Sequence, residues 1–308
     1  MGQNTDNKST PALNERGKQR QLEKKLSGDS LWQISMRKFM KDKIALIGLF
    51  FIFLLIFLAI FADLIAPYSY KEINLDAISQ APSAEHIFGT DFFGRDMFSR
   101  VIYGTRISLL VGIVSQSVAL VLGLTLGSIS GYYTGWVDTI IMRIADVIFA
   151  FPSLLLIIAI MVSLGPGLQN VFLAIGLVGW VGIARIIRSQ TLSIKEQEFV
   201  LAAKSLGASD RRVITKHIMP NAFPPLIVSF TMGMAGAIMS EATLSFLGLG
   251  AQPPTASWGG DISAGLQYLR SAWWISFWPG VALALTVLAF NLFGDGLRDA
   301  LDPSLRNV

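Results

Sequence analysis

Side chains able to carry out acid–base, nucleophilic or metal chemistry are few in this chain. It has 308 residues with no cysteine, and its two histidines, His86 and His217, lie far apart. The lack of cysteine excludes disulfides, thiolate metal sites and cysteine nucleophiles. No catalytic cluster converges on one predicted face, and no G-x-x-x-x-G-K-[ST] phosphate loop is present. We therefore expect no catalytic residue, metal site or bound cofactor here, so that any ATP and Mg²⁺ would bind to partner subunits.

The elements that position the remaining polar residues are long apolar helices. Hydrophobic residues make up 52% of the chain and charged residues only 15%, well below the roughly 25% charged content of soluble domains. Uncharged runs near 20 residues are long enough to cross a bilayer as helices. The composition predicts an all-α, polytopic membrane protein with a six-helix domain over residues 44–300. Its predicted spans are 44–62, 107–129, 147–164, 168–187, 222–246 and 274–294.

The third and fourth spans are predicted to be two helices because the uncharged run that contains them is too long for one. Residues 147–184 carry no charge, and as one helix they would be about 57 Å long, too long for a single crossing of a roughly 30 Å hydrocarbon core. The sequence Gly165-Pro166-Gly167 divides the run. We therefore expect one span to end and another to begin at these glycines.

Charge asymmetry predicts the orientation. Residues 1–43 contain ten Lys or Arg against five Asp or Glu, whereas residues 63–106 contain four against six. Since basic residues gather on the cytoplasmic side, we expect both termini in the cytoplasm, with residues 301–308 as a second tail. The first 43 residues form a basic cytoplasmic tail, expected to be largely disordered to about residue 30 because of their polar composition.

A polar island interrupts the apolar runs at residues 198–225, "EFVLAAKSLGASDRRVITKHIMPNAFPP". Helical spacing places Phe199, Ala202, Ala203 and Leu206 on one face. Gly207 follows where a helix end favours a left-handed residue, and Pro220 is expected to stop a second short helix. The pattern predicts a compact helix–Gly–helix in the cytoplasm, with an exposed apolar stripe that should bury against a partner.

Glu241 is the one acidic residue in the predicted fifth span. An acid inside a membrane helix is a functional candidate: it could line a translocation path, or pair structurally with a neighbouring helix. Arg143 and Asp146, three residues apart, are expected to pair with each other or to extend toward the interface. Small residues at helical spacing predict close helix packing, and they are Gly123, Gly127, Gly131, Gly233 and Gly236.

Several motifs together resemble one family. The run "LAAKSLG…HIMPN" resembles the EAA-x3-G…LP cytoplasmic loop of bacterial ABC importer permeases. Nearly the whole chain resembles the dipeptide/oligopeptide permease subfamily, C-type subunit. The matching stretches are "FGTDFFGRDMFSRVIYGTRISL" (88–109), "GYYTGWVDTIIMRIADVIFAFPSLLL" (131–156), "SEATLSFLGLGAQPPTASWG" (240–259) and "FNLFGDGLRDALDPSLR" (290–306).

The resemblance implies a type I ABC importer permease of MetI-like architecture that moves di- or oligopeptides across the cytoplasmic membrane. It implies a heterodimer with a homologous permease, two ATP-binding subunits and an extracytoplasmic substrate-binding protein, in a lipid bilayer and without nucleic acid. It also implies that residues 195–221 are the ATPase-coupling loop. Its site residues would be Glu198, Leu201, Ala202, Ala203, Gly207, Asp210, His217 and Pro220.

One residue of the loop departs from the family pattern. Leu201 occupies the position of the family's leading glutamate, and Glu198 lies one turn earlier. The acidic role could move to Glu198, or Leu201 could make an apolar contact instead.

Three other functions compete with a peptide importer. Import of nickel complexes or glutathione would use the same architecture. A proton-coupled secondary transporter should show several buried acids and an internal repeat, and a membrane enzyme should show a catalytic cluster; neither pattern is present.

Overall fold

The structure is a computed structural model that describes residues 31–301, so the predicted disordered tail and residues 302–308 lie outside it. Five of its helices are long and apolar enough to cross a membrane, and a bent pair forms a sixth crossing if it is counted as one span. They are α3 (Lys43–Ile60), α5 (Met97–Tyr133), α8 (Leu168–Ile194), α12 (Phe223–Phe246) and α14 (Trp274–Leu301), and the bent pair is α6 (Gly135–Phe149) with α7 (Ser153–Leu164).

Short helices complete the described part of the chain. They are α2 (Leu31–Phe39), α4 (Ala62–Ile65), η1 (Leu75–Ala77), α9 (Glu198–Ser205), α10 (Asp210–Val213), η2 (Ile214–Ile218), α11 (Met219–Asn221), α13 (Trp258–Gly265) and η3 (Leu266–Tyr268). Sheet pairing within residues 31–301 is limited to one isolated bridge.

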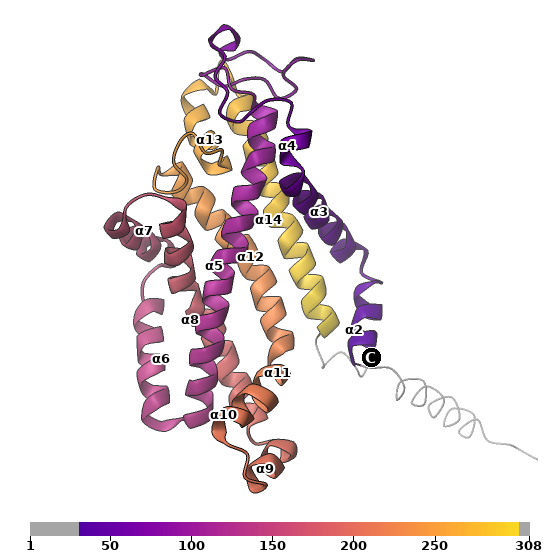
Figure 1. The fold of residues 1–308 in the computed structure, drawn as a ribbon, viewed down its shortest axis with the longest axis vertical. Helices are drawn as coiled ribbons and strands as arrows, with labels where there is room; N and C mark the ends of the chain where they lie inside the picture. The colour runs from indigo at the N-terminus through magenta and orange to yellow at the C-terminus, as the bar shows by residue number, and fades with distance from the viewer. Residues whose placement is uncertain (1–30, 302–308) are drawn as a thin grey trace, which may run out of the picture.

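The long helix α5 organises the molecule (Figure 1). The first turn of α5 forms part of the cap, which we define as residues 62–100 and 250–273, and the other end of α5 meets the polar loop, residues 195–221. Helices α3 and α14 lie on one side of α5, and α6, α7 and α8 lie on the other (Figure 1). The helix begins ten residues before the predicted second span, because Asp96 caps it by accepting the Ser99 N–H.

The predicted third span, 147–164, is wrong as a continuous helix. Helix α6 ends at Phe149, α7 begins at Ser153, and their axes differ by 91°. Pro152 explains the break, because its ring disfavours helical backbone at the residue before it and it has no N–H to donate to the preceding turn. The crossing in this region is therefore bent, with α7 turned sharply from the direction of α6 (Figure 1). Ile157 and Met161 of α7 pack in a core cluster with residues of α5, α8 and α12.

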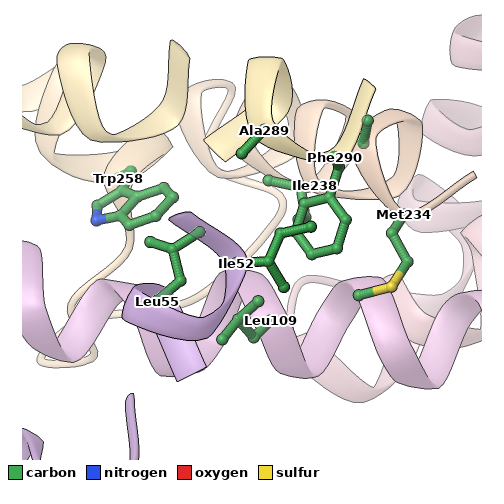
Figure 2. Close-up of a cluster of buried hydrophobic side chains, with 9 residues drawn as sticks. Ile52, Leu55, Leu109, Met234, Ile238, Trp258, Ala289 and Phe290 are labelled. Atoms are coloured by element: carbon green, nitrogen blue, oxygen red, sulfur yellow. The ribbon is translucent and has the colours of Figure 1, made fainter. Parts of the chain in front are cut away.

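Apolar side chains from five helices form the core between α3, α5, α12, α13 and α14. Figure 2 shows Ile52 and Leu55 of α3 packed near Leu109 of α5 and Phe290 of α14. Trp258 of α13 closes the end of this cluster nearest the cap, and its indole N–H donates to the carbonyl of Val101. The core thus ties the cap to the membrane helices.

Candidate functional site: the polar loop and the charged helix faces

The polar loop lies at the opposite end of the molecule from the cap (Figure 1). A small apolar cluster holds it against the end of α5, where Tyr132 packs on Val200, Val213, Ile214 and Ile218. Val200, Val213 and Ile218 are completely buried. Because each short helix of the loop contributes to this cluster, the loop is attached to α5 as one packed body.

Polar contacts fasten the same joint. The Tyr132 hydroxyl donates to the carboxylate of Asp210 at 2.5 Å, and the Lys204 ammonium lies 4.6 Å from the centre of the Tyr132 ring. Lys195 donates to the carbonyl of Gly131. Asp210, predicted as a loop residue from the sequence, therefore acts inside the chain as an anchor to α5.

The outward face of α9 is apolar and uncovered. Leu206 is 90% exposed, and Phe199 and Leu201 are each 46% exposed. Ala202 on the same face is exposed and Ala203 is partly exposed, so no large side chain shields the helix there. Glu198 is also exposed, in the first turn of α9. The structure thus places the predicted apolar stripe on the surface, and Leu201, outside that stripe, is exposed as well.

Gly207 provides the bend after α9. Its φ is +81°, in the left-handed region that favours glycine, and a Cβ there would meet no heavy atom within 4 Å. His217 is partly buried with its ring 6.3 Å from that of Phe199, which brings the two halves of the loop together.

Pro220 does not stop the second helix as predicted. A π-helical segment, Ile214–Ile218, precedes it, and the helical run continues through α11 to Asn221. A π turn shifts the hydrogen-bonding register, which removes the need for the N–H that proline lacks. Only at Ala222 does the chain turn before α12 begins, with prolines in its first turn.

Glu241 is fully buried within this chain. The Ser245 hydroxyl donates to its Oε1 at 2.6 Å, and Ser245 in turn accepts the N–H of Ala251. The second carboxylate oxygen has no hydrogen-bond partner among the described residues. The side chain therefore supports the turn that leaves α12 and is not exposed on the surface of this chain.

The predicted packing glycines differ in their surroundings. A Cβ added at Gly123, Gly127 or Gly131 would lie 2.6–2.7 Å from atoms of α8, so α5 and α8 approach closely at these glycines. Gly233 lies against the side chain of Gln116, whereas Gly236 has no neighbour within 4 Å of such a Cβ. Gly236 is thus on an open face of α12 and does not pack against the rest of the described chain.

The predicted pair of Arg143 and Asp146 does not form. Arg185 of α8 donates to Asp146 of α6 at 2.8 Å, while Arg143 is exposed. A second cross-helix pair joins Arg188 to Asp138. Sequence reasoning missed both pairs, because it considered only partners a helical turn away on the same helix.

The cap contains buried ion pairs that the sequence did not indicate. Arg100 contacts Asp261 at 2.5 Å, with side-chain exposures of 4% and 5%. His86 Nδ1 lies 2.9 Å from Asp96, and Arg95 contacts Asp91. The His86 ring is therefore paired with the Asp96 carboxylate. Residues 31–301 contain no group of three or more His, Cys, Asp or Glu side chains that could hold a metal ion.

Comparison with known proteins identifies the family. The family model described as binding-protein-dependent transport system inner membrane component matches residues 123–307, and the model of the N-terminal TM domain of oligopeptide transport permease C matches residues 30–82. The chain belongs to the binding-protein-dependent transport permease family. It is thus a multi-pass inner-membrane permease, a component of a membrane transport system.

Relatives of this permease carry peptide and glutathione names. It is 48% identical to the dipeptide transport system permease protein DppC of Alkalihalophilus pseudofirmus, over 90% of this chain and 91% of the relative. It is 46% identical to the oligopeptide transport system permease protein OppC of Bacillus subtilis, over 90% and 91%. It is 43% identical to the glutathione transport system permease protein GsiD of Pectobacterium atrosepticum, over 90% and 92%.

A solved structure shares the permease fold. The inward-facing MetNI methionine ABC transporter matches with a TM-score of 0.54 at 20% identity, over 67% of this chain and 98% of the matched chain. This likeness shows the MetI-type arrangement of helices and nothing more specific. The all-α, polytopic architecture predicted from the sequence is confirmed.

Proposed function

We propose that this permease is one membrane subunit of an ABC importer for di- or oligopeptides. The observation that supports this most is the identity of 44–48% to three permeases named for dipeptide or oligopeptide transport, over 90% of the chain. Glutathione is the second candidate, because relatives named for its transport are 43–45% identical. Glutathione is itself a small peptide-like molecule with free charged ends, so both substrates suit one chemistry.

The importer would contain four further components. They are a homologous permease, two ATP-binding subunits and an extracytoplasmic substrate-binding protein. The chain has no phosphate loop, so ATP and Mg²⁺ would be held by the ATP-binding subunits. Excess basic charge in residues 1–43 and in the polar loop supports a cytoplasmic location for both termini and the loop, with the cap on the outer side.

The polar loop would transmit the ATPase movement. The exposed apolar face of α9 supports a docking role, because a face carrying Leu206 at 90% exposure is stabilised by burial against a partner. The Tyr132 cluster attaches this face to α5. Since the loop moves with α5 as one packed body, displacement of α9 would be passed to the membrane helices and not lost in the loop.

Uptake measurements test the substrate. Proteoliposomes containing the complete transporter and its binding protein should accumulate labelled dipeptide when ATP is supplied. Unlabelled glutathione should compete strongly only if it is the better substrate. Uptake of glutathione with no uptake of any di- or oligopeptide would overturn the peptide proposal and favour the second candidate.

Variants at Gly207 test the coupling role. Gly207→Val places a β-branched residue at φ +81°, which should cost about 1–3 kcal/mol of backbone strain and distort the docking face. Gly207→Asn is the matched control, because asparagine tolerates the left-handed region. We expect the valine variant to reach the membrane yet lose peptide uptake, and the asparagine variant to retain it. Normal uptake in Gly207→Val would contradict the coupling role.

A further inference from the structure

The two ion pairs between α6 and α8 differ in how completely their atoms are bonded. Arg188 donates through two nitrogens to both oxygens of Asp138, at 2.6 and 2.5 Å. Asp138 also accepts a hydrogen bond from Ser130 of α5. This pair is saturated and bridges three helices, as a structural pair should.

The Arg185–Asp146 pair is held by a single hydrogen bond. One guanidinium nitrogen donates to one oxygen of Asp146, and the side chains are 40% and 56% exposed. Within the described chain, the second Asp146 oxygen and the remaining Arg185 nitrogens have no further hydrogen bond. Arg185 is nevertheless positioned, because its guanidinium lies 4.3 Å from the centre of the Phe149 ring.

An open pocket lies at this pair. Its volume is about 380 Å³, and Met142, Asp146, Arg185 and Arg188 line it. The pocket is immediately below the break between α6 and α7, since α6 ends three residues after Asp146. The site therefore combines the hydrogen-bond acceptor Asp146, the positioned guanidinium of Arg185 and an open pocket beside the break between α6 and α7.

The depth of the pair along the helices indicates what faces it. Asp146 lies eleven residues into α6 and Arg185 nine residues before the end of α8, which places each about 15 Å from the loop end of its helix. Half-exposed charges at such depth are unfavourable against lipid and normally face a bundle interior or water. By contrast, α3 exposes Ile47, Phe50 and Phe53 and carries no charge beyond its first residue.

We propose that the α6–α8 pocket faces the substrate path, and that it receives the charged ends of a zwitterionic peptide. Asp146 accepts hydrogen bonds from the peptide ammonium, and Arg185 donates to its carboxylate. This inference rests on the proposed peptide import and adds the residues that would contact the substrate. The exchange is balanced in charge, because the peptide replaces one internal ion pair by two equivalent ones.

The end of α6 adds to the ammonium site. The last carbonyl groups of a helix carry partial negative charge, and Asp146 lies in the last turn of α6. A cation beside Asp146 is thus favoured by both the carboxylate and the helix end. Because Arg188 is already bonded to Asp138, Arg185 is the arginine in the pocket that can contact a substrate anion.

Thiol labelling tests the proposal in the complete transporter. The chain has no native cysteine, so Met142→Cys introduces a single thiol into the pocket. We expect a charged, membrane-impermeant thiol reagent to modify it from the loop side in inverted vesicles. Dipeptide at roughly ten times its half-saturating concentration should slow the reaction about tenfold. Phe53→Cys on α3 is the control and should not react.

Blocked peptides and charge variants assign the contacts. A dipeptide with an amidated C-terminus should protect Met142→Cys less than the free dipeptide does. An N-acetylated dipeptide should likewise protect less than the free dipeptide. Adding Arg185→Gln should remove the difference in protection between the free and the amidated dipeptide. Adding Asp146→Asn should remove the difference in protection between the free and the N-acetylated dipeptide. Asp146→Cys provides a second reporter of water access if Met142→Cys does not fold.

Three outcomes would overturn the inference. No reaction at either pocket thiol would mean that lipid or protein covers this face, and protection by added anionic phospholipid but not by dipeptide would mean a lipid site. Failure of the proposed function is seen separately, as absent peptide uptake in the unmodified transporter. Labelling without peptide protection in a transporter that does take up peptides would contradict only the inference.

Discussion

The cap and the polar loop lie at opposite ends of α5 and differ in which side chains they bury and which they expose. The cap buries ion pairs, with Arg100 and Asp261 almost completely enclosed, whereas the polar loop exposes apolar side chains, with Leu206 nearly free of contacts. A buried charge must find its partner within the chain, and an exposed apolar face is best satisfied by another chain. The buried charges of the cap are therefore satisfied within the chain, while the apolar face of the loop remains available for contact with another chain.

Loss of the buried cap pair should have the largest effect on stability. Arg100→Met leaves Asp261 as an unpaired buried charge, and we expect the free energy of unfolding to fall by about 3–5 kcal/mol. Thermal unfolding of the purified chain in detergent measures this. The contrasting control is Arg106→Met, which removes the partner of Asp63 in a pair whose side chains are 35% and 67% exposed, together with hydrogen bonds to the carbonyls of Ala59 and Ile60. It should lower the free energy of unfolding far less than Arg100→Met does. Equal effects would refute the contrast.

The pH dependence of the same variant sharpens the comparison. Burial raises the pKa of Asp261 above its ordinary value of 3.8, and the charge of Arg100 opposes that rise. Without Arg100 the folded-state pKa rises further, so the folded variant holds the proton more tightly than the unfolded chain. Its free energy of unfolding should then decrease as pH increases, and its deficit against the parent should be smaller near about pH 5 than near about pH 8. A deficit independent of pH would argue against a charged Asp261.

The hydrogen bond from Arg106 lowers the pKa of Asp63 instead. This carboxylate is exposed, and its pair contributes while ionised. The contribution of this pair is present above the ordinary pKa of 3.8 and is lost as pH falls through the lowered folded-state pKa. The deficit of Arg106→Met should therefore stay constant between about pH 8 and about pH 5 and disappear only in more acidic solution, which distinguishes the exposed pair from the buried one.

Removal of the two buried methyl groups of Val213, where the polar loop packs on α5, should have an intermediate effect on stability. Val213 is fully buried in the Tyr132 cluster, and Val213→Ala should destabilise the loop by about 2 kcal/mol. Because the loop can open without global unfolding, the measurement is hydrogen exchange of the loop amides, which should become about thirtyfold faster. Val147→Ala, at an exposed position of α6, should leave that exchange unchanged. Unaltered exchange in Val213→Ala would show that the cluster does not hold the loop.

Truncation of the exposed loop leucine should have the smallest effect on stability. Leu206→Ser should change the free energy of unfolding by no more than about 0.5 kcal/mol. Binding of the isolated ATP-binding subunit should nevertheless weaken about tenfold, because a leucine no longer enters the interface. Leu64→Ser, 82% exposed at the cap end, should leave that binding unchanged. If both variants bound the subunit equally well, the apolar face of α9 would not be the docking surface.

The features that the sequence predicted best are those that depend on local pattern. The apolar runs, the stop at Gly165–Gly167 and the stripe on α9 follow from hydrophobicity and helical spacing within one segment. The break near Pro152 and the π turn before Pro220 were missed or misplaced, since proline only limits the backbone and neighbouring packing decides how the chain accommodates it.

The sequence by itself determined that this chain is a bundle of apolar helices with a polar loop, without a nucleotide-binding loop of its own. Only the tertiary structure decided which charges meet. Asp146 pairs with Arg185 across two helices and not with Arg143 on its own helix, and Arg100 meets Asp261 across 161 residues of sequence. The physical reason is that hydrophobic periodicity depends only on residues close together in the sequence. The partner of a charged side chain depends instead on how separate helices pack against one another.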